Sequence, residues 1–340
     1  MVRKRTVAAS LDDCYGLLEV SPQARPEVIR AAHRALMAIH HPDRGGDGEV
    51  AKRLNAAYEV LSDSGTRREY DRTRTTLQGT ILGAYRVLER IAEGAIGVTY
   101  KGEHVLTGLP VCIKHCAWVD AAANEVLLAE AKLMWDLRHF AIPLIRDVTR
   151  DAEGRVALVM SYIPGPTVAQ LVEKHRRLDV QHVTWIAQRV LNALMYLHDC
   201  GVVHGDLKPQ NIIVQPEDFI VSVVDYGLAM VKPTAASTST GYSAFFSPPE
   251  QLTPGPLVPA SDFYALGMTM VHMLAGMRGV ERKEVPADVP DAICAFVQKL
   301  IVHDVLRRQF AAKQLADELM EIRVQCFGRD AVWKMKPLSV

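Results

Sequence analysis

The sequence predicts a multidomain chain in which a small all-α helical hairpin precedes a larger α+β domain. The hairpin is predicted because apolar residues recur at helical spacing over about 26–40 and 49–61, with a proline-containing break between the two runs. The larger domain is predicted because short apolar runs typical of strands adjoin clusters of polar residues in the rest of the chain. A length of 340 residues is enough for each part to bury a core.

The first long helix is expected over about 26–40, because Pro26 suits a first helical turn and Pro42 prevents the helix from continuing. A second helix is expected over about 49–61. We expect the two to pack as an antiparallel hairpin through their apolar faces. These faces comprise Val28, Ile29, Ala32, Leu36 and Ile39 on the first helix, and Leu54, Ala57, Tyr58 and Leu61 on the second.

Residues 12–72 resemble a J domain of the DnaJ family. The resemblance rests on the run 13–20, on His41-Pro42-Asp43 between the two helices, and on the closing run 67–71. It implies that His41, Pro42 and Asp43 dock on the ATPase domain of a DnaK-type heat-shock chaperone. Arg25, Arg30 and Arg34 are candidates for the basic face that accompanies this loop, although an ordinary solvated helix surface explains them equally well.

The larger domain contains a dense group of polar residues at 204–211, followed by Asp225-Tyr226-Gly227. Apolar runs at 212–214 and 221–224 adjoin them, so both groups lie at the ends of short strands, where side chains can converge. Phosphoryl transfer needs a carboxylate that faces the attacking hydroxyl, and a second carboxylate with an amide oxygen to bind magnesium. Asp206, Asn211 and Asp225 provide these groups, so the segment indicates a phosphoryl-transfer site.

A glycine-rich segment at 92–99 and a lysine in an apolar strand, Lys114, precede this group. Glycine lets the backbone approach phosphate oxygens closely. Lys114 requires a carboxylate partner, because a charged side chain in an apolar strand is otherwise expected to point outward. The two candidate partners are Glu125 and Glu130, and Glu130 opens a run with apolar residues at helical spacing.

Together with the runs 242–250 and 262–267 and with Arg308, these motifs resemble the eukaryotic-type Ser/Thr protein kinases over residues 83–322. The resemblance implies an α+β two-lobed protein kinase fold that uses ATP and Mg²⁺ to phosphorylate protein hydroxyls. The run from Lys208 to Pro209 and the presence of Ser243 favour serine and threonine over tyrosine as acceptors.

The resemblance also implies a role for each matching residue. Asp206 would accept the proton of the substrate hydroxyl, and Lys208 would offset charge on the transferred phosphoryl group. Lys114, held by Glu130, would orient the nucleotide phosphates. Asn211 and Asp225 would hold magnesium. The implied nucleotide-binding residues are Gly94, Gly97, Thr99, Cys112, Lys114, Met160 and Ile213, with Met160 as the gatekeeper of the adenine pocket.

Four positions depart from the family pattern. Ala92 replaces the first glycine of the glycine-rich loop, and Thr99 and Cys112 replace smaller apolar residues beside adenine. Gly205 replaces the arginine that usually receives an activation-loop phosphate. The activation segment is rich in hydroxyls, so autophosphorylation there is chemically easy, but we expect activity not to depend on it. These hydroxyl residues are Thr234, Ser237, Thr238, Ser239 and Thr240.

The composition excludes some function classes. Lys+Arg and Asp+Glu both number 39, so neither nucleic acid nor a membrane surface is expected as the main partner. The chain has no run of about twenty apolar residues, and its six cysteines form no metal-ligand pattern. We therefore expect a cytoplasmic protein, with a linker at 73–82 and a C-terminal tail at 323–340.

Three hypotheses for the function remain open. The first, which we favour, is an active Ser/Thr protein kinase whose partners are a protein substrate and a DnaK-type chaperone. The second is a pseudokinase adaptor or co-chaperone that brings a chaperone to its clients. The third is a small-molecule phosphotransferase, which shares the spacing of Asp206 and Asn211 but usually lacks a segment like 242–250.

Overall fold

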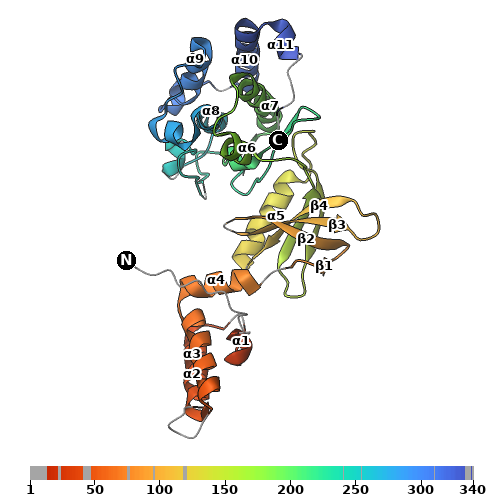
Figure 1. The fold of residues 1–340 in the computed structure, drawn as a ribbon, viewed down its shortest axis with the longest axis vertical. Coiled ribbons are helices and arrows are strands. Elements are labelled where there is room, and N and C mark those ends of the chain that lie inside the picture. Colours follow the sequence, from red (N-terminus) through yellow and green to blue (C-terminus); the bar gives the residue numbers. More distant parts are fainter. Residues whose placement is uncertain are drawn as a thin grey trace.

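The computed structural model describes residues 14–21, 24–40, 47–74, 77–94, 96–117, 121–239, 241–253, 255–309, 311–333 and 338. Figure 1 shows the N-terminal helices, a lobe built on a β-sheet and a helical lobe, with the sheet lobe between the other two. The predicted all-α hairpin and the predicted α+β two-lobed domain are both confirmed. No helix in the described part of the chain is both long and apolar enough to span a membrane.

The N-terminal part contains α1 (Cys14–Leu17), α2 (Pro26–His40), α3 (Gly48–Ser62) and α4 (Ser64–Arg74). The two long helices begin and end within one residue of the predicted bounds and form the predicted hairpin (Figure 1). Asp47 caps α3, because its carboxylate accepts a hydrogen bond from the backbone N–H of Glu49 at 2.8 Å.

The predicted apolar face of α2 is wrong at two positions. Val28 is 50% exposed and Ile39 is 66% exposed, whereas Ile29 is fully buried. The helical period places Ile29, Leu36 and Met37 toward α3, and this turns Val28 and Ile39 away from the hairpin core. On α3, Leu54, Ala57 and Leu61 are buried as predicted, and Tyr58 stacks on His33 with ring centroids 4.2 Å apart.

Helix α4 fastens α1 to the hairpin. The hydroxyl of Tyr15 donates to Asp71 at 2.8 Å and accepts from the guanidinium of Arg67, also at 2.8 Å. The hydroxyl of Tyr70 accepts from the backbone N–H of Cys14 at 2.7 Å. Burial raises the pKa of Tyr15 to about 12, so its hydroxyl keeps its proton and its hydrogen bonds with Asp71 and Arg67. The closing run 67–71 therefore completes this small core.

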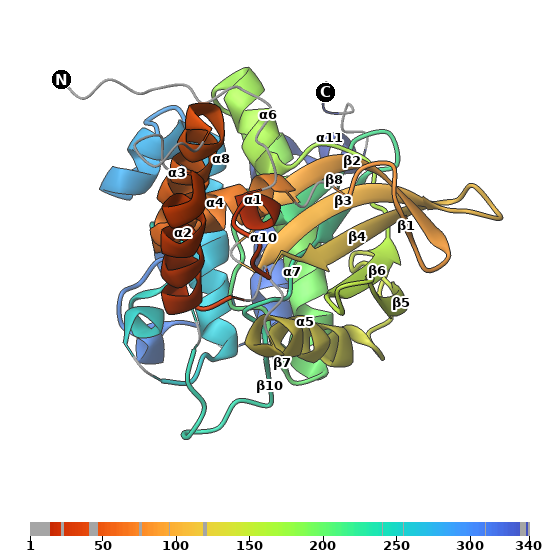
Figure 2. The same ribbon diagram turned by 90° about the horizontal axis from the view of Figure 1, so that it is seen from below.

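The small lobe contains one antiparallel sheet of six strands in the order β1-β2-β3-β4-β6-β5. Its strands are β1 (Ile81–Leu82), β2 (Tyr85–Glu93), β3 (Gly97–His104), β4 (Pro110–Cys116), β5 (Ile145–Arg150) and β6 (Val156–Ser161). Helix α5 (Ala121–Met134) packs on the sheet through Leu127 and Ala131, which contact the apolar residues of β4 and β6 (Figure 2). Leu77, which follows α4, packs in the other apolar cluster of this lobe.

The helical lobe contains α6 (Val168–His175), α7 (Val180–Asp199), α8 (Pro259–Arg282), α9 (Asp291–Leu300), α10 (Ala312–Phe327) and α11 (Arg329–Trp333). Two short antiparallel pairs lie beside these helices, β7 (Val202–Val203) with β10 (Met230–Val231) and β8 (Ile212–Gln215) with β9 (Ile220–Val223). Helices α7 and α8 form the centre of the core, and α8 is buried along most of its length. Both predicted polar groups lie at the ends of these short strands, as the apolar runs indicated.

Candidate active site

A buried carboxylate on α8 holds the loop that carries Asp206. Asp262 is 1% exposed and accepts hydrogen bonds from the backbone N–H groups of His204 and Gly205, both at 2.9 Å. It also accepts from Nε2 of His198 on α7 at 2.8 Å. Burial favours a higher pKa for Asp262, but its hydrogen bond and charge interaction with His198 outweigh burial and lower that pKa. The loop backbone is therefore bonded to an ionised group in the core of the helical lobe.

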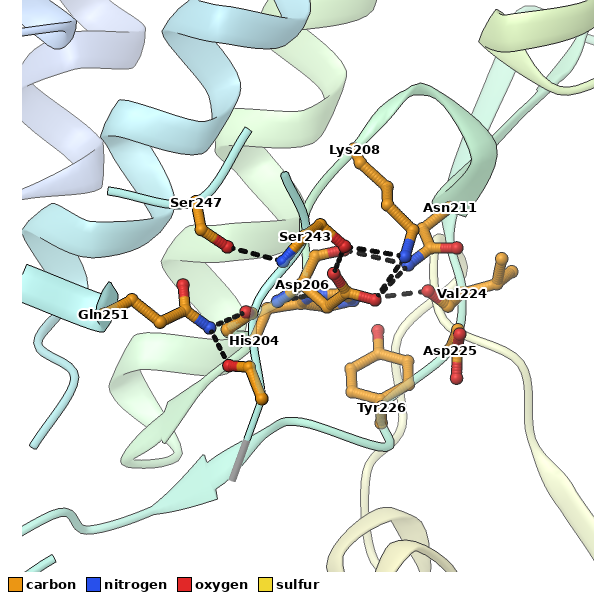
Figure 3. A network of polar contacts seen from close by, with 12 residues as sticks. His204, Asp206, Lys208, Asn211, Val224, Asp225, Tyr226, Ser243, Ser247 and Gln251 are labelled. Carbon is orange, nitrogen blue, oxygen red and sulfur yellow. Dashed lines mark hydrogen bonds and ion pairs between the residues drawn. The ribbon is translucent and has the colours of Figure 1, made fainter. Parts of the chain in front are cut away.

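Asp206 accepts hydrogen bonds through both of its carboxylate oxygens (Figure 3). Its Oδ2 lies 2.7 Å from Nζ of Lys208 and 3.1 Å from Nδ2 of Asn211. Its Oδ1 accepts from the hydroxyl of Ser243 at 2.6 Å, and Lys208 also donates to that hydroxyl at 2.9 Å. The structure thus places a serine hydroxyl between a carboxylate and an ammonium group.

Lys114 lies in a second cluster of charges. Its Nζ contacts the two carboxylate oxygens of Glu130 at 2.9 and 2.7 Å, and Oδ1 of Asp225 at 2.6 Å. The structure therefore pairs Lys114 with Glu130, while Glu125 is exposed. Three elements meet here, because Lys114 lies on β4, Glu130 on α5 and Asp225 just after β9.

Burial and charge act against each other in this cluster. Burial favours a lower pKa for Lys114, but the carboxylates of Asp225 and Glu130 outweigh it and raise that pKa. Burial favours a higher pKa for Asp225, and the charge of Lys114 outweighs it and lowers that pKa. For Glu130, burial is the larger effect and raises the pKa against the attraction of Lys114. Lys114 stays charged near neutral pH because two acidic groups surround it.

The glycine-rich segment forms the turn between β2 and β3. The N–H of Gly94 donates to the carbonyl of Gly97 at 2.8 Å. A Cβ atom at Gly97 would lie 2.1 Å from the carbonyl oxygen of His115, so only glycine fits here. The sheet places Cys112 opposite Met160, and Thr99 opposite Lys114. Ile213 lies on β8, in the other lobe.

The far end of the activation segment is held by an ion pair between the half-buried Glu250 and the buried Arg308. The two guanidinium NH groups of Arg308 contact the two oxygens of Glu250 at 2.6 and 2.9 Å, and Ser261 also donates to Glu250 at 2.9 Å. Arg308 is 4% exposed and its guanidinium lies 4.8 Å from the ring centre of Tyr264. Bidentate pairs of this kind fix geometry strongly, so the segment after Ser243 is held against the helical lobe.

Gly205 has a backbone that a side chain would strain. Its φ is +73°, and a Cβ atom there would lie 2.6 Å from the carbonyl oxygen of Leu228 and 2.9 Å from Cδ1 of Leu257. Leu257 is fully buried. The position that holds arginine in the family pattern therefore has no room for a side chain in this backbone arrangement.

Some of the predicted site residues lie outside the described residues. They are His41, Pro42 and Asp43 of the predicted chaperone-docking loop, and Thr240 of the activation segment. Thr234 and Thr238 are exposed, while Ser237 and Ser239 are half-buried. The backbone N–H of Thr234 donates to the hydroxyl of Ser237 at 2.9 Å.

Asn211 and Asp225 have the donor atoms that Mg²⁺ prefers. Asn211 donates through Nδ2 to the backbone carbonyl of Asp206 at 2.8 Å, which leaves its oxygen as the atom available for a cation. The Oδ1 atom of Asp225 contacts Lys114, and its Oδ2 atom remains as a ligand for a cation. The two residues therefore fit a magnesium ion that the phosphates of a nucleotide would also coordinate.

Sequence reasoning missed two contacts in this site. It did not predict that the hydroxyl of Ser243 contacts Asp206, nor that His198 supports Asp262. Both contacts join residues more than thirty positions apart in the sequence. The position of Ser243, seven residues before Glu250, was the available signal for the first contact, and no sequence signal indicated the second.

Comparison with known families agrees with this geometry. A model of the protein kinase domain matches residues 85–330. The chain belongs to the protein kinase family. A model of the DnaJ domain matches residues 13–71, in front of the kinase domain. Both resemblances predicted from the motifs are confirmed.

Several curated relatives are serine/threonine-protein kinases by name. The serine/threonine-protein kinase PknL of Mycobacterium bovis is 31% identical over 238 residues, which cover 65% of this chain and 58% of that protein. A probable serine/threonine-protein kinase of Clostridium acetobutylicum is 27% identical over 271 residues, 72% of this chain and 41% of its own length. PknA of Mycobacterium tuberculosis is 27% identical over 269 residues, 72% of this chain and 62% of its own length. The chain thus spans about two fifths to three fifths of the length of these relatives.

Proposed function

We propose that this protein is an ATP-dependent Ser/Thr protein kinase that transfers the γ-phosphoryl group to protein hydroxyls. The observation that carries the proposal is the contact of the Ser243 hydroxyl with Asp206 at 2.6 Å and with Lys208 at 2.9 Å. An acceptor hydroxyl that approaches Asp206 beside Ser243 would meet the same carboxylate and the same ammonium group. These are the contacts that a phosphoryl acceptor requires.

The residues divide the chemistry between them. Asp206 would orient the acceptor hydroxyl and accept its proton, and Lys208 would offset the negative charge on the transferred phosphoryl group. Lys114 would bind the α- and β-phosphates, with Glu130 fixing its position. Asn211 and Asp225 would hold Mg²⁺, which when bound supplies positive charge against the triphosphate. Gly94, Gly97, Thr99, Cys112, Met160 and Ile213 would surround the nucleotide.

Two observations favour this function over its alternatives. Every catalytic group of the family pattern is present, and Lys114, Glu130 and Asp225 already lie in contact, which disfavours a pseudokinase. The Glu250–Arg308 pair holds an activation segment against the helical lobe, a part that small-molecule phosphotransferases usually lack. The first observation favours an active enzyme, and the second favours a protein as the substrate.

Incubation of the purified protein with γ-labelled ATP tests this proposal, with Asp206→Ala as the comparison. We expect label on protein serine or threonine that depends on Asp206. Label on a metabolite would indicate the small-molecule phosphotransferase. An absence of transfer under conditions where a chaperone still binds would indicate the adaptor.

We also propose that the J domain recruits a DnaK-type chaperone through His41, Pro42 and Asp43. The match of residues 13–71 to the DnaJ domain supports this, and so does the exposure of Arg30 and Arg34 on α2 and of Arg25 just before it. His41→Gln should abolish stimulation of the chaperone ATPase without changing kinase turnover on a peptide. The matched control is His303→Gln, at an exposed position in the helical lobe, which should change neither activity. If the wild-type protein does not stimulate the chaperone of its own source organism, the recruitment proposal is wrong.

A further inference from the structure

Gln251 connects the catalytic loop to the activation segment. It lies in the short helix η3 (Pro249–Leu252), directly after Glu250, and is 4% exposed. Its Nε2 donates to the carbonyl oxygen of Gly205 at 2.7 Å and to the carbonyl oxygen of Gly241 at 2.9 Å (Figure 3). Both hydrogens of one side-chain amide are therefore used, each on a different segment of the site.

The two carbonyls belong to residues that lie close in sequence to Asp206 and Ser243. Gly205 immediately precedes Asp206, and Gly241 lies two residues before Ser243. A change in the distance between these two backbones would separate the hydroxyl of Ser243 from Asp206. The backbone that carries Gln251 is held as well, because the neighbouring Glu250 is bound to Arg308 and Ser261. Gln251 therefore sets the spacing between two segments that must meet at the reaction centre.

The chemistry of the contact is specific for an amide side chain. Buried backbone carbonyls need donors, and an unsatisfied one costs about 1–3 kcal/mol. A glutamine provides two N–H donors without a charge that would itself need a partner in the interior. A glutamate of the same shape would instead place oxygens against both carbonyl oxygens.

The usual means of ordering this segment in the family pattern does not fit here. A Cβ atom at Gly205 would lie 2.6 Å from the carbonyl oxygen of Leu228 and 2.9 Å from Leu257, so an arginine that could receive a loop phosphate has no room. The hydrogen bonds of Gln251 join the same two segments without any phosphate group. They supply a connection that is already present in the unmodified chain.

We propose that Gln251 is a positioning residue that holds the activation segment in its substrate-binding arrangement without phosphorylation. The inference rests on the proposed kinase function for its kinetic consequence. Loss of the amide donors should weaken binding of the protein substrate more than binding of ATP, because Lys114, Glu130 and Asp225 make no contact with Gln251 among the described residues. The nucleotide half of the site should therefore stay intact.

The test uses the full-length, dephosphorylated protein and two variants. Gln251→Met removes both donors at similar size, and Gln251→Glu replaces them with acceptors. The matched control is Gln188→Met on α7, because Gln188 is 7% exposed and its Nε2 likewise donates to one carbonyl, that of Ala316, at 3.0 Å. Steady-state kinetics gives KM for peptide and for ATP, and hydrogen exchange measures protection of the amides over 237–247.

We expect Gln251→Met to raise KM for the peptide at least tenfold and to leave KM for ATP within twofold of the wild-type value. Exchange over 237–247 should be at least tenfold faster than in Gln188→Met. Gln251→Glu should show the larger effect. The proposal is wrong if both variants keep the wild-type KM for peptide and the wild-type exchange. It is also wrong if peptide and ATP binding weaken equally, as a general loss of stability would cause.

Hydrogen exchange separates this proposal from the proposed kinase function. If the wild-type protein transfers no phosphoryl group, the kinase function fails. The exchange of residues 237–247 in Gln251→Met still shows whether Gln251 orders the segment. Unchanged exchange in that case would overturn the positioning role too.

Discussion

Lys114 and Asp206 carry out neighbouring parts of the proposed chemistry, but the fold holds them in different ways. Lys114 is held by ion pairs to Glu130 at 2.7 Å and to Asp225 at 2.6 Å, and these groups come from three separate elements. Asp206 lies on a loop whose backbone N–H groups are bonded to Asp262, inside the core of the helical lobe.

The two halves of the site are therefore sensitive to different substitutions. The charge cluster of Lys114 depends on the position of α5. Among the described contacts of Lys114, Glu130 is the one residue that this helix contributes. The loop of Asp206 depends on backbone bonds within one lobe. Substitutions that remove a charge from the Lys114 cluster should therefore affect nucleotide binding. Substitutions at Asp206 should affect the transfer step.

The largest effect is expected from Asp206→Asn. Asparagine keeps one oxygen, which can accept a hydrogen bond from Lys208, while its amide N–H can face the oxygen of Ser243. It cannot accept a proton. We expect kcat to fall by about 10²–10⁴, the usual contribution of a positioned general base. KM for ATP should stay the same, because the Lys114 cluster is unchanged.

Single-turnover transfer to a peptide measures this effect. Asp218→Asn, in the exposed turn between β8 and β9, is the matched control and should behave like the wild type. Turnover by Asp206→Asn within threefold of the wild-type rate would remove the assignment of Asp206 as the base.

A smaller effect is expected in the other half of the site from Glu130→Gln. The variant keeps the shape of the side chain but removes one of two negative charges beside Lys114, which leaves Asp225 as its charged partner. Lys114 would then compete with Mg²⁺ for Asp225. We expect kcat/KM for ATP to fall by about 10–100-fold, or roughly 1.4–2.7 kcal/mol.

Glu125→Gln provides the control for this variant, since Glu125 lies on the same helix and is exposed. Its kcat/KM for ATP should equal the wild-type value. Equal losses in the two variants would mean that the helix as a whole, and not the Lys114–Glu130 pair, determines nucleotide binding.

Acid should weaken the small lobe through His115. This residue on β4 is 1% exposed and donates a hydrogen bond to the carboxylate of Asp151 at 2.8 Å, and its pKa is lowered because burial disfavours the charged ring. Below pH about 6.5, His115 therefore binds a proton more readily in the unfolded chain than in the folded chain. The free energy of unfolding falls as pH falls through that range. One such group contributes at most about 1.4 kcal/mol per pH unit.

Thermal unfolding between pH 7.5 and 5.5 measures this dependence. His115→Gln should flatten the fall in Tm over that range. Some dependence should remain, because burial also lowers the pKa of His139 and of His272. An unchanged slope in His115→Gln would show that protonation of this residue does not limit acid stability.

The smallest effect is expected from loss of the activation-segment hydroxyls. Alanine at Thr234, Ser237, Thr238, Ser239 and Thr240 together should change turnover less than about fivefold, or roughly 1 kcal/mol of barrier. The reason is that Gly205 has no room for the arginine that would receive a phosphate. Phosphatase treatment provides the independent measurement, and a hundredfold loss of activity after it would contradict this argument.

The sequence by itself determined the elements and most of the residues that meet. Helix α2 begins and ends where Pro26 and Pro42 predicted, because proline restricts its own backbone and that of the preceding residue. That Lys114 needs a carboxylate partner was also predictable, because a charged group in a buried strand needs an opposite charge, and the resemblance to the protein kinases selected Glu130 over Glu125. These are local rules, and they depend on few residues.

Only the tertiary structure decided which face of α2 is buried and which distant groups touch. Val28 and Ile39 fit an apolar pattern but are exposed, because the position of α3 selects the buried side of the helix. The contacts of Ser243 with Asp206 and of Gln251 with Gly205 join segments 37 and 46 residues apart. A hydrogen bond requires positions accurate to a few tenths of an ångström. No periodicity in the sequence specifies such a position, since it results from the packing of the whole lobe.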